Sequence, residues 1–411
     1  MTNTDANELD RQDPLASKRK EFILPDDVVY LDGNSLGPLS IKAKERAAEV
    51  VNQQWGSDLI TSWNKHQWID LPQQVGSKIA RLIGAEPHEV ICCDSTSINL
   101  FKVLSLALKL NPDRTKILSQ TDNFPTDLYM AEGLQDLLGQ SRCELVHTSA
   151  EHISENLNDD VAVLFLTQVN FRTGAIHDIE ELTQQAHEKG ILVIWDLAHS
   201  AGVIPLDLTN WGVDFAIGCG YKYLNGGPGA PAFVYAATKY HTTLMQPLTG
   251  WMGHAQPFAF SPSYAPAQNM KQFLSGTPTI VSMSILDAAL DVYRDLDIEQ
   301  IRTKSLTMTE YFATQISTGE VFKELAPVSP MAESERGSQL SFQHPDAYAI
   351  CQAWIDAGVI ADFRDPDILR VGFAPLYLSY ADLDIALHKL AEILVNKTYL
   401  RDQFQQRKAV T

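Results

Sequence analysis

Lys222 and its neighbours favour chemistry over a surface role. The lysine lies in residues 218–223 (GCGYKY), just before the glycine-rich stretch 224–229 (LNGGPG). Lysine is usually a solvated surface side chain. Here the glycine-rich and aromatic surroundings would desolvate the amine and favour its uncharged, nucleophilic form, which can form a Schiff base with a carbonyl compound. The residue type and its setting therefore predict a reactive amine.

An acidic residue upstream fits the same chemistry. Asp196 follows the apolar run 191–195 (ILVIW). Taken alone it could cap a helix. At the carboxyl end of a buried parallel strand, however, an acid lies where open α/β sheets bind their ligands. A carboxylate there can keep a proton on a pyridine nitrogen, so that the ring withdraws electrons.

Two more segments would complete a site for a phosphate-bearing ring. Thr96 and Ser97, within DSTS at 94–97, precede a predicted helix at 98–110. Their hydroxyls and the free backbone N–H groups of a helix N-terminus bind anions, although such residues also serve as ordinary caps. Phe124, beside Pro125, could cover one face of a ring or belong to the core. Together with the lysine and the acid, these groups predict pyridoxal 5′-phosphate (PLP) as cofactor.

The elements that position these residues indicate an α/β fold. Apolar runs at 89–93, 161–166 and 191–195 read as strands, and an amphipathic helix at 178–190 joins the last two. Such a βαβ unit predicts parallel strands buried on both faces. Further strands are predicted at 213–217, 231–235 and 368–373, helices at 281–317 and 382–395, and an extended loop at 253–273. We expect an N-terminal segment (1–60) packed on the small domain, a large PLP-binding α/β domain with a mostly parallel sheet (61–280) and a small α+β domain (281–411).

Composition excludes several classes of function. The 411 residues carry 32 Lys+Arg against 51 Asp+Glu, a formal charge of −19 that opposes binding to nucleic acid or anionic lipid. No apolar run is long enough to cross a bilayer, and residues 1–21 lack a signal or transit pattern. The five cysteines are odd in number and form no CxxC pair, and no Cys/His cluster indicates a metal. The sequence predicts a cytoplasmic protein without a metal site.

Eight stretches resemble one family of PLP enzymes, and together they cover nearly the whole chain. They match kynureninases more closely than other branches of the fold-type I, class V aminotransferase group. The most specific are YKYLNGGPG and GWMGH, whereas WDLAH is shared with desulfurases and aminotransferases. The stretches are Tyr30–Pro38 (YLDGNSLGP), Asp94–Leu100 (DSTSINL), Phe124–Asp127 (FPTD), Trp195–Gly202 (WDLAHSAG), Gly220–Ala232 (GYKYLNGGPGAPA), Gly250–His254 (GWMGH), Ser275–Pro278 (SGTP) and Leu369–Leu378 (LRVGFAPLYL).

The resemblance implies a cofactor role for each matching residue. Lys222 would form the Schiff base, Asp196 would pair with the pyridine nitrogen and Phe124 would stack on the ring. Trp251 and Thr277 would come from the second subunit, so the family implies a homodimer with shared sites. The implied cofactor contacts are Thr96, Ser97, Phe124, Asp127, Thr167, Asp196, His199, Tyr221, Lys222, Trp251 and Thr277.

The resemblance also implies how an amino-acid substrate is held. Arg370 would bind the α-carboxylate, a bidentate task suited to a guanidinium, although a surface salt bridge is its ordinary alternative. Asn34, Ser35 and Trp63 would meet the aromatic end of the substrate. The match around Trp63 also allows His66 or Trp68 in that place.

The implied reaction is the PLP-dependent hydrolysis of L-kynurenine, and of its 3-hydroxy derivative, to anthranilate or 3-hydroxyanthranilate and L-alanine in tryptophan degradation. The catalytic residues would be Lys222, which moves the Cα proton, Asp196 and Tyr221, a candidate proton shuttle beside the lysine.

Other functions remain open at this point. A cysteine desulfurase or small-molecule aminotransferase would share the scaffold, but a desulfurase needs a mobile cysteine, and Cys351 lies in a predicted helix (AYAICQAWI). A nicotinamide-dependent oxidoreductase shares the βαβ pattern but requires a GxGxxG turn after a strand, which is absent here. A binding module that had lost catalysis would not need both Lys222 and Asp196.

Overall fold

A computed structural model describes residues 5–243 and 245–408, and the chain divides into two compact units. The large unit contains residues 42–170 and 177–291, and the small unit contains residues 1–41, 171–176 and 292–411. The chain passes from the small to the large unit between residues 41 and 42 and returns between residues 291 and 292. The sequence predicted these domain boundaries at 60/61 and 280/281. Residues 1–4, 244 and 409–411 of the predicted domains lie outside the described part, and the domain assignment itself stays a prediction.

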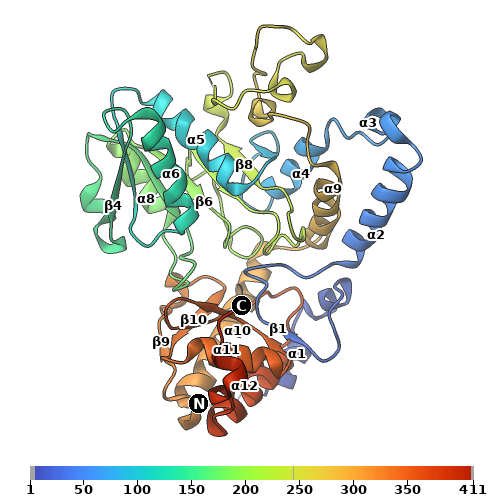
Figure 1. Ribbon diagram of the computed structural model, residues 1–411, viewed down its shortest axis with the longest axis vertical. Helices are drawn as coiled ribbons and strands as arrows, with labels where there is room; N and C mark the ends of the chain where they lie inside the picture. The colour runs from blue at the N-terminus through green and yellow to red at the C-terminus, as the bar shows by residue number, and fades with distance from the viewer. Residues whose placement is uncertain (1–4, 244, 409–411) are drawn as a thin grey trace. The chain divides into compact units, whose positions relative to one another are not determined.

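The large unit is built on a seven-stranded sheet with the order β2-β8-β7-β6-β5-β3-β4 (Figure 1). Only β8 runs against its neighbours, so the predicted mostly parallel sheet is confirmed. The strands are β2 (Val90–Cys92), β3 (Lys116–Gln120), β4 (Glu144–Thr148), β5 (Val161–Thr167), β6 (Leu192–Asp196), β7 (Phe215–Gly218) and β8 (Phe233–Ala236). The helices are α2 (Ile41–Glu49), α3 (Ser62–Lys65), α4 (Leu71–Ala80), α5 (Thr96–Leu110), α6 (Pro125–Leu138), α7 (Ile153–Asn156), α8 (Ile179–Glu188) and α9 (Ile280–Ala289).

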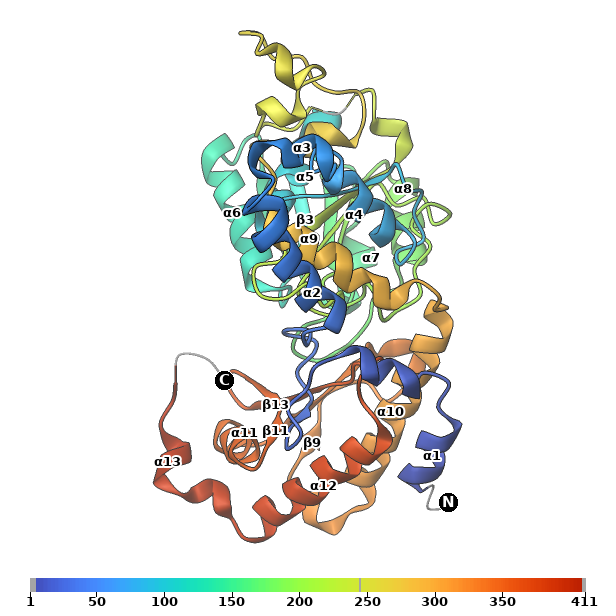
Figure 2. The ribbon, with the colours of Figure 1, turned by 90° about the vertical axis from the view of Figure 1, so that its right-hand side faces the viewer.

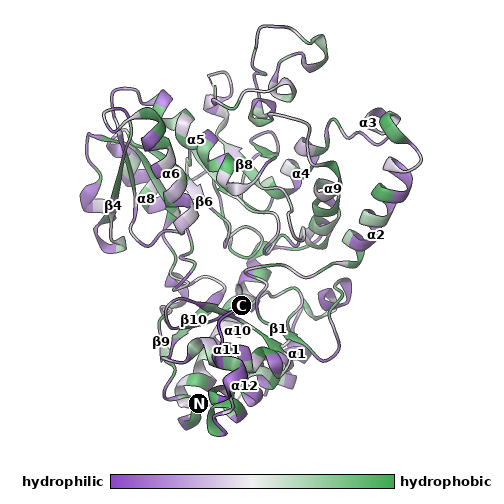
Figure 3. Cartoon of the chain, in the orientation of Figure 1, coloured by the Kyte–Doolittle hydropathy of each residue, from purple (hydrophilic) through white to green (hydrophobic). Residues whose placement is uncertain are grey.

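The sheet separates two layers of helices because successive side chains of a strand point to opposite faces. Ile194 belongs to the core formed with α5 and α6, whereas the next residue, Trp195, donates its indole N–H to Thr183 of α8 at 3.2 Å. The strands are buried on both faces, as their continuous apolar runs predict. The helices also differ in hydropathy: in Figure 3, α9 is mostly hydrophobic, whereas α2 is mostly hydrophilic.

The small unit contains a four-stranded antiparallel sheet with the order β12-β13-β10-β9 and a parallel pair, β1 and β11. Helices α10 and α12 pack against each other, and α1 packs on α12 (Figure 2). The strands are β1 (Val29–Tyr30), β9 (Ala326–Pro327), β10 (Gln339–Gln343), β11 (Val359–Ile360), β12 (Asp362–Arg364) and β13 (Ile368–Gly372). The helices are α1 (Ala6–Gln12), α10 (Ile298–Thr318), α11 (Ala347–Asp356), α12 (Tyr380–Val395) and α13 (Asp402–Gln405).

Local signals explain most element ends. Ser379 caps α12 in a reciprocal capping box with Asp382, and Asp178 caps α8. The predicted loop at 253–273 contains only short 3-10 turns: the end of η6 (Trp251–Gly253), η7 (Pro257–Ala259) and η8 (Met270–Phe273). Among residues 5–243 and 245–408, no helix combines the length and the apolar character that a bilayer span requires.

Candidate active site

The carboxyl ends of β5 and β6 bring three predicted residues of the large unit together. Thr167 and Asp196 are the last residues of these neighbouring strands and pair across the ladder. The Thr167 hydroxyl lies 3.3 Å from a carboxylate oxygen of Asp127, which belongs to the first turn of α6. Asp196 accepts a hydrogen bond from the backbone N–H of Ala198 at 2.8 Å, so it caps a turn and no helix follows it. The sheet thus places an acid at the edge where ligands bind.

Asp127 and Asp196 form a coupled pair of buried carboxyl groups. Their side chains are hydrogen-bonded to each other, and only 2% and 3% of the two residues is exposed. Burial and the neighbouring Asp196 charge raise the pKa of Asp127 well above its usual range. Burial also raises the pKa of Asp196, while the charge of Lys222 and the N–H of Ala198 oppose that shift. The pair therefore carries a shared proton more readily than two separate carboxylates would, because like charges in contact cannot both ionise easily.

Lys222 lies beside this acid pair and beside three predicted cofactor contacts. Its Nζ is 3.0 Å from Nε2 of His199 and 6.0 Å from the ring centroids of both Phe124 and Tyr221. Phe124 is 39% exposed, which answers the alternative that it is a core residue. The amine is therefore flanked by an imidazole, the exposed ring of Phe124 and the half-buried ring of Tyr221, an arrangement that leaves it partly accessible to a flat ligand.

The loop around Lys222 depends on close backbone contacts. The N–H of Gly226 donates to the carbonyl of Gly220 at 2.8 Å, and a Cβ at Gly226 would lie 2.7 Å from that same oxygen. Only glycine permits this approach without displacement. The glycine-rich stretch that marked the site in the sequence thus closes the turn that holds the lysine.

The N-terminus of α5 supplies the predicted anion-binding groups. The helix begins at Thr96, two residues before the predicted start, and Ser95 caps it by accepting from the N–H of Ile98 at 3.4 Å. Thr96 and Ser97 occupy the first turn and are partly exposed. Hydroxyls and backbone N–H groups at the positive end of a fifteen-residue helix suit a phosphate.

Trp251 and Thr277 lie on exposed segments of the large unit. Trp251 begins the η6 turn and contacts Phe258 and Phe260, with ring centroids 5.7 and 6.2 Å away. These two phenylalanines are 61% and 75% exposed. Thr277 is also exposed. Trp251, Phe258 and Phe260 therefore form an exposed aromatic cluster on the large unit.

The predicted substrate residues are divided between the units. In the small unit, Arg370 of β13 is buried and bonded to Asp362, Phe171 and Ser35, so the alternative of a surface salt bridge does not describe it. Asn34, which is buried, donates to Gln339 at 3.3 Å.

Trp63 lies in the large unit on α3, where it packs against the core and meets Trp68 edge to face at 5.9 Å. The two alternatives for its role have partners of their own: His66 lies 2.8 Å from Asp58, and Trp68 donates to Gln54 at 2.8 Å. The roles of all three in binding a substrate stay predictions.

The sequence analysis did not identify two residues that hydrogen-bond to the predicted site residues. Asn123 accepts from the Thr167 hydroxyl at 2.5 Å and donates to Ser119 at 3.1 Å, which ties the acid pair to β3. Asp362 holds the guanidinium of Arg370. Asn123 immediately precedes the FPTD stretch, and Asp362 faces Arg370 across a strand pair, so only adjacency and strand register could have indicated them.

The functional groups gathered in the large unit fit PLP. It combines an accessible amine, a buried acid pair at a strand end, an exposed aromatic ring, and hydroxyls at a helix N-terminus. These groups match the aldehyde, the pyridine nitrogen, the ring face and the phosphate of that cofactor.

Comparisons with known proteins identify similar chains. Residues 301–390 match the family model described as the kynureninase C-terminal domain. The kynureninase of Pseudomonas fluorescens is 47% identical over 414 residues, which span 100% of each chain. Two solved structures share the fold at low identity. A C-DES variant with glycine covalently linked to its PLP cofactor has a TM-score of 0.78 at 17% identity and covers 91% of this chain and 99% of its own. The cysteine desulfurase CsdA of Escherichia coli has a TM-score of 0.77 at 19% identity and covers 93% and 98%.

Proposed function

The chain belongs to the kynureninase family, and we propose that it is a PLP-dependent enzyme that hydrolyses L-kynurenine to anthranilate and L-alanine. The single observation that carries this proposal is the full-length identity of 47% to a kynureninase. The lysine beside a buried acid pair supports it. The fold-type I class and the predicted cofactor agree with the solved relatives. The 3-hydroxy derivative is proposed as a second substrate, and tryptophan degradation as the pathway served.

Each residue of the site has a task in this reaction. Bound PLP supplies an electron sink for negative charge that develops on the attached substrate. Lys222 would hold the cofactor covalently, and its amine would accept the proton from the substrate Cα. Asp196, supported by Asp127, would keep a proton at the pyridine nitrogen, while Thr96 and Ser97 would bind the phosphate. Water adds to the γ-carbonyl of kynurenine, the Cβ–Cγ bond breaks, and protons returned to carbon complete L-alanine.

Tyr221 is proposed to relay protons near Lys222. Burial raises the pKa of its hydroxyl, which stays protonated at neutral pH and can donate. Tyr221→Phe should lower the turnover number by about 10²-fold or more because a proton-transfer group is lost, while the absorbance of the bound cofactor stays unchanged. Stopped-flow spectra and steady-state rates test this. An unchanged turnover number would remove Tyr221 from the mechanism.

We further propose that the enzyme is a homodimer in which Trp251 and Thr277 enter the partner's site. The exposed aromatic cluster of Trp251, Phe258 and Phe260 supports this, since exposed apolar surface of this kind marks interaction sites.

Mixed dimers provide the test of this arrangement. Lys222→Ala and Trp251→Ala should each be nearly inactive alone. When the two chains are co-expressed, the Lys222 of one chain meets the intact Trp251 of the other, and activity should recover to about a quarter of the wild-type value, since half the dimers are hybrid and each has one complete site. Absence of recovery, with both chains folded, would place Trp251 in its own subunit's site, and an active Trp251→Ala dimer would place it outside any site.

The assay for the proposed function is direct. Protein is incubated with PLP and L-kynurenine, and anthranilate is followed by its fluorescence, with Lys222→Ala as the control. Sulfide release from L-cysteine is measured in parallel, because two solved structures with this fold are named a cysteine desulfurase and a cystine C-S lyase. We expect anthranilate and no sulfide: Cys351 is buried within α11, and burial raises the pKa of its thiol well above the usual range, so it lacks a mobile thiolate. A cytoplasmic location is part of the proposal, and the five free, buried cysteines support it.

A further inference from the structure

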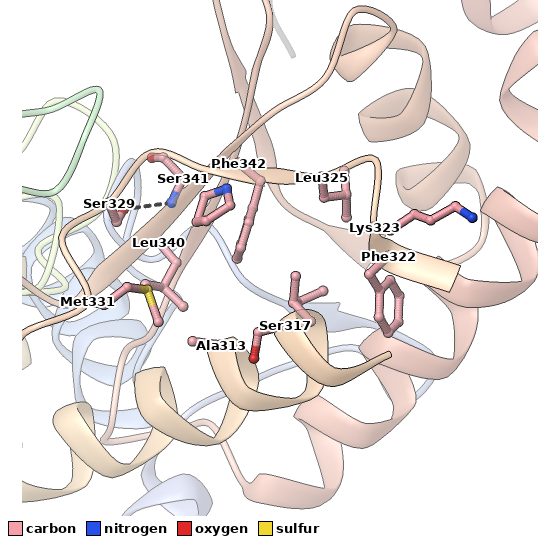
Figure 4. A pocket seen from close by; sticks show the side chains of 12 residues that line it. Ala313, Ser317, Phe322, Lys323, Leu325, Ser329, Met331, Leu340, Ser341 and Phe342 are labelled. Atoms are coloured by element: carbon pink, nitrogen blue, oxygen red, sulfur yellow. Dashed lines mark hydrogen bonds between the residues drawn. The ribbon is translucent and has the colours of Figure 1, made fainter. Parts of the chain in front are cut away.

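The four-stranded sheet of the small unit has one apolar and one polar face. Leu340 and Phe342 of β10 line an apolar cavity of about 340 Å³ next to α10 (Figure 4). Ser341, between them, belongs to the other face and pairs in register with Arg370, which in turn pairs with Asp362. Because side chains alternate along a strand, Arg364 shares this polar face. A buried sheet face made of charged residues indicates a ligand-binding surface, since burying charge without function is costly.

Arg370 is held on this face by nearly all of its donors. Its Nε donates to Asp362 at 2.8 Å and its Nη2 to the other carboxylate oxygen of Asp362. Nη1 donates to the carbonyl of Phe171 at 2.6 Å, and Nη2 donates to the Ser35 hydroxyl at 2.8 Å. A guanidinium has five N–H groups, so one remains for a ligand. Arg364 also donates to Asp362, at 2.7 Å, and its Nε is buried without a hydrogen-bond partner among the described residues.

Asp32 is the second carboxyl group of this cluster. One of its oxygens, Oδ1, is buried and has no hydrogen-bond partner in the described part of the chain. Burial and the Asp362 carboxylate raise the pKa of Asp32 to about 7, although Arg370, Ser35 and Arg364 act in the opposite direction. The titratable and charged groups that face it are Tyr30 from β1, Cys351 from α11, Asp362 and Arg364 from β12, and Arg370 from β13.

Above pH 7, where Asp32 is ionised, the charges of this cluster balance only while no anion is bound. Two guanidinium groups, of Arg364 and Arg370, face two carboxyl groups, of Asp32 and Asp362. A ligand carboxylate would add a third negative charge in a buried place, where unbalanced charge is expensive. Asp362 is fixed by its bonds to both arginines, whereas Asp32 has an oxygen that could carry a proton.

We propose that Asp32 takes up one proton from solvent when the carboxylate of an amino acid binds to Arg370, so that carboxylate binding and protonation of Asp32 are coupled. The inference rests on the proposed function, because the kynureninase resemblance is what implies that Arg370 binds the substrate carboxylate. Asp32 is a positioning residue in this scheme and does not touch the reacting atoms. In the unliganded protein the Asp32 carboxyl is increasingly ionised above pH 7. Carboxylate binding then requires a proton from solvent, so the affinity for the carboxylate falls as pH rises above 7.

Calorimetry measures the proton directly. L-Alanine, one product of the proposed reaction, is titrated into the PLP-loaded enzyme at pH 8 in two buffers with different enthalpies of ionisation. The amine of L-alanine exchanges protons equally in every variant, so the difference between wild type and Asp32→Asn reports Asp32 alone. We expect wild type to take up about one proton per site more than Asp32→Asn. Asp26→Asn, an exposed aspartate just before β1, is the matched control and should behave as wild type.

Kinetics supply a second readout. Between pH 7 and 9 the ratio of the KM for L-kynurenine in wild type to that in Asp32→Asn should rise by up to about tenfold per pH unit, with little change in the ratio of kcat values. Equal proton uptake in wild type and Asp32→Asn, or a KM ratio independent of pH, would overturn the proposal. Thermal unfolding verifies that the variant is folded, and Asp32→Ser serves as a second variant. If L-kynurenine is not cleaved but the uptake difference is found with L-alanine, the proposed function fails and this inference stands.

Discussion

Lys222→Ala is expected to abolish both turnover and covalent attachment of the cofactor. The Nζ of Lys222 lies 3.0 Å from Nε2 of His199, and its charge acts on Asp196 of the acid pair, so the substitution removes the amine that the proposed mechanism uses for attachment and for proton transfer. Loss of a group that acts as both nucleophile and general base should lower the rate of anthranilate formation by about 10⁴-fold or more. The absorbance of the attached cofactor should disappear, while dialysis should still show PLP held through its phosphate and ring contacts.

Lys323→Ala is the matched control, because Lys323 is an exposed lysine in a surface ion pair with Glu320. It should keep the wild-type rate and spectrum. Borohydride reduction followed by peptide mapping gives an independent check, and a cofactor label on a lysine other than 222 would contradict the assignment.

Asp196→Asn should produce the second largest loss. The amide cannot hold a positive charge on the pyridine nitrogen, so the electron-withdrawing power of the ring falls, and we expect turnover to drop by about 10²- to 10³-fold. Affinity for PLP should fall as well. Asp127→Asn should lose less, because an amide can still donate to Asp196 and burial already favours the protonated form of Asp127. Steady-state rates and PLP titrations on the two variants measure the difference.

Asp113→Asn provides the control for this substitution, since Asp113 is exposed on the turn after α5. If Asp196→Asn kept the wild-type turnover number, or if Asp127→Asn were the more damaging change, the assignment of Asp196 to the pyridine nitrogen would be wrong.

The sequence predicted the elements that have strong local signals. The runs at 161–166 and 191–195 became β5 and β6, parallel as the connecting helix required, and Asp196 ends its strand at the ligand-binding edge. Phe124, which sequence could not separate from a core residue, is exposed next to Lys222. The kynureninase resemblance was confirmed by a full-length relative. Periodicity and motifs sufficed because these features are local in the chain.

The remaining features depend on contacts between distant segments. The bond between Asp127 and Asp196 joins the start of α6 to the end of β6, and Asp362 reaches Arg370 only through the register of β12 and β13. The antiparallel direction of β8 and the assignment of residues 171–176 to the small unit have no local signature either. Side-chain pairing across a sheet is set by the register of the strands. The apolar residues of β12 and β13 do not by themselves show that Asp362 lies opposite Arg370.

Product balance is the most direct test of the central claim that this site hydrolyses the Cβ–Cγ bond of L-kynurenine. The PLP-loaded enzyme is incubated with L-kynurenine, and anthranilate and L-alanine are quantified together. The account predicts one mole of each for every mole of L-kynurenine consumed, and neither with Lys222→Ala. Consumption of L-kynurenine to its keto acid without anthranilate, as in transamination, or no consumption by a cofactor-loaded enzyme, would contradict it.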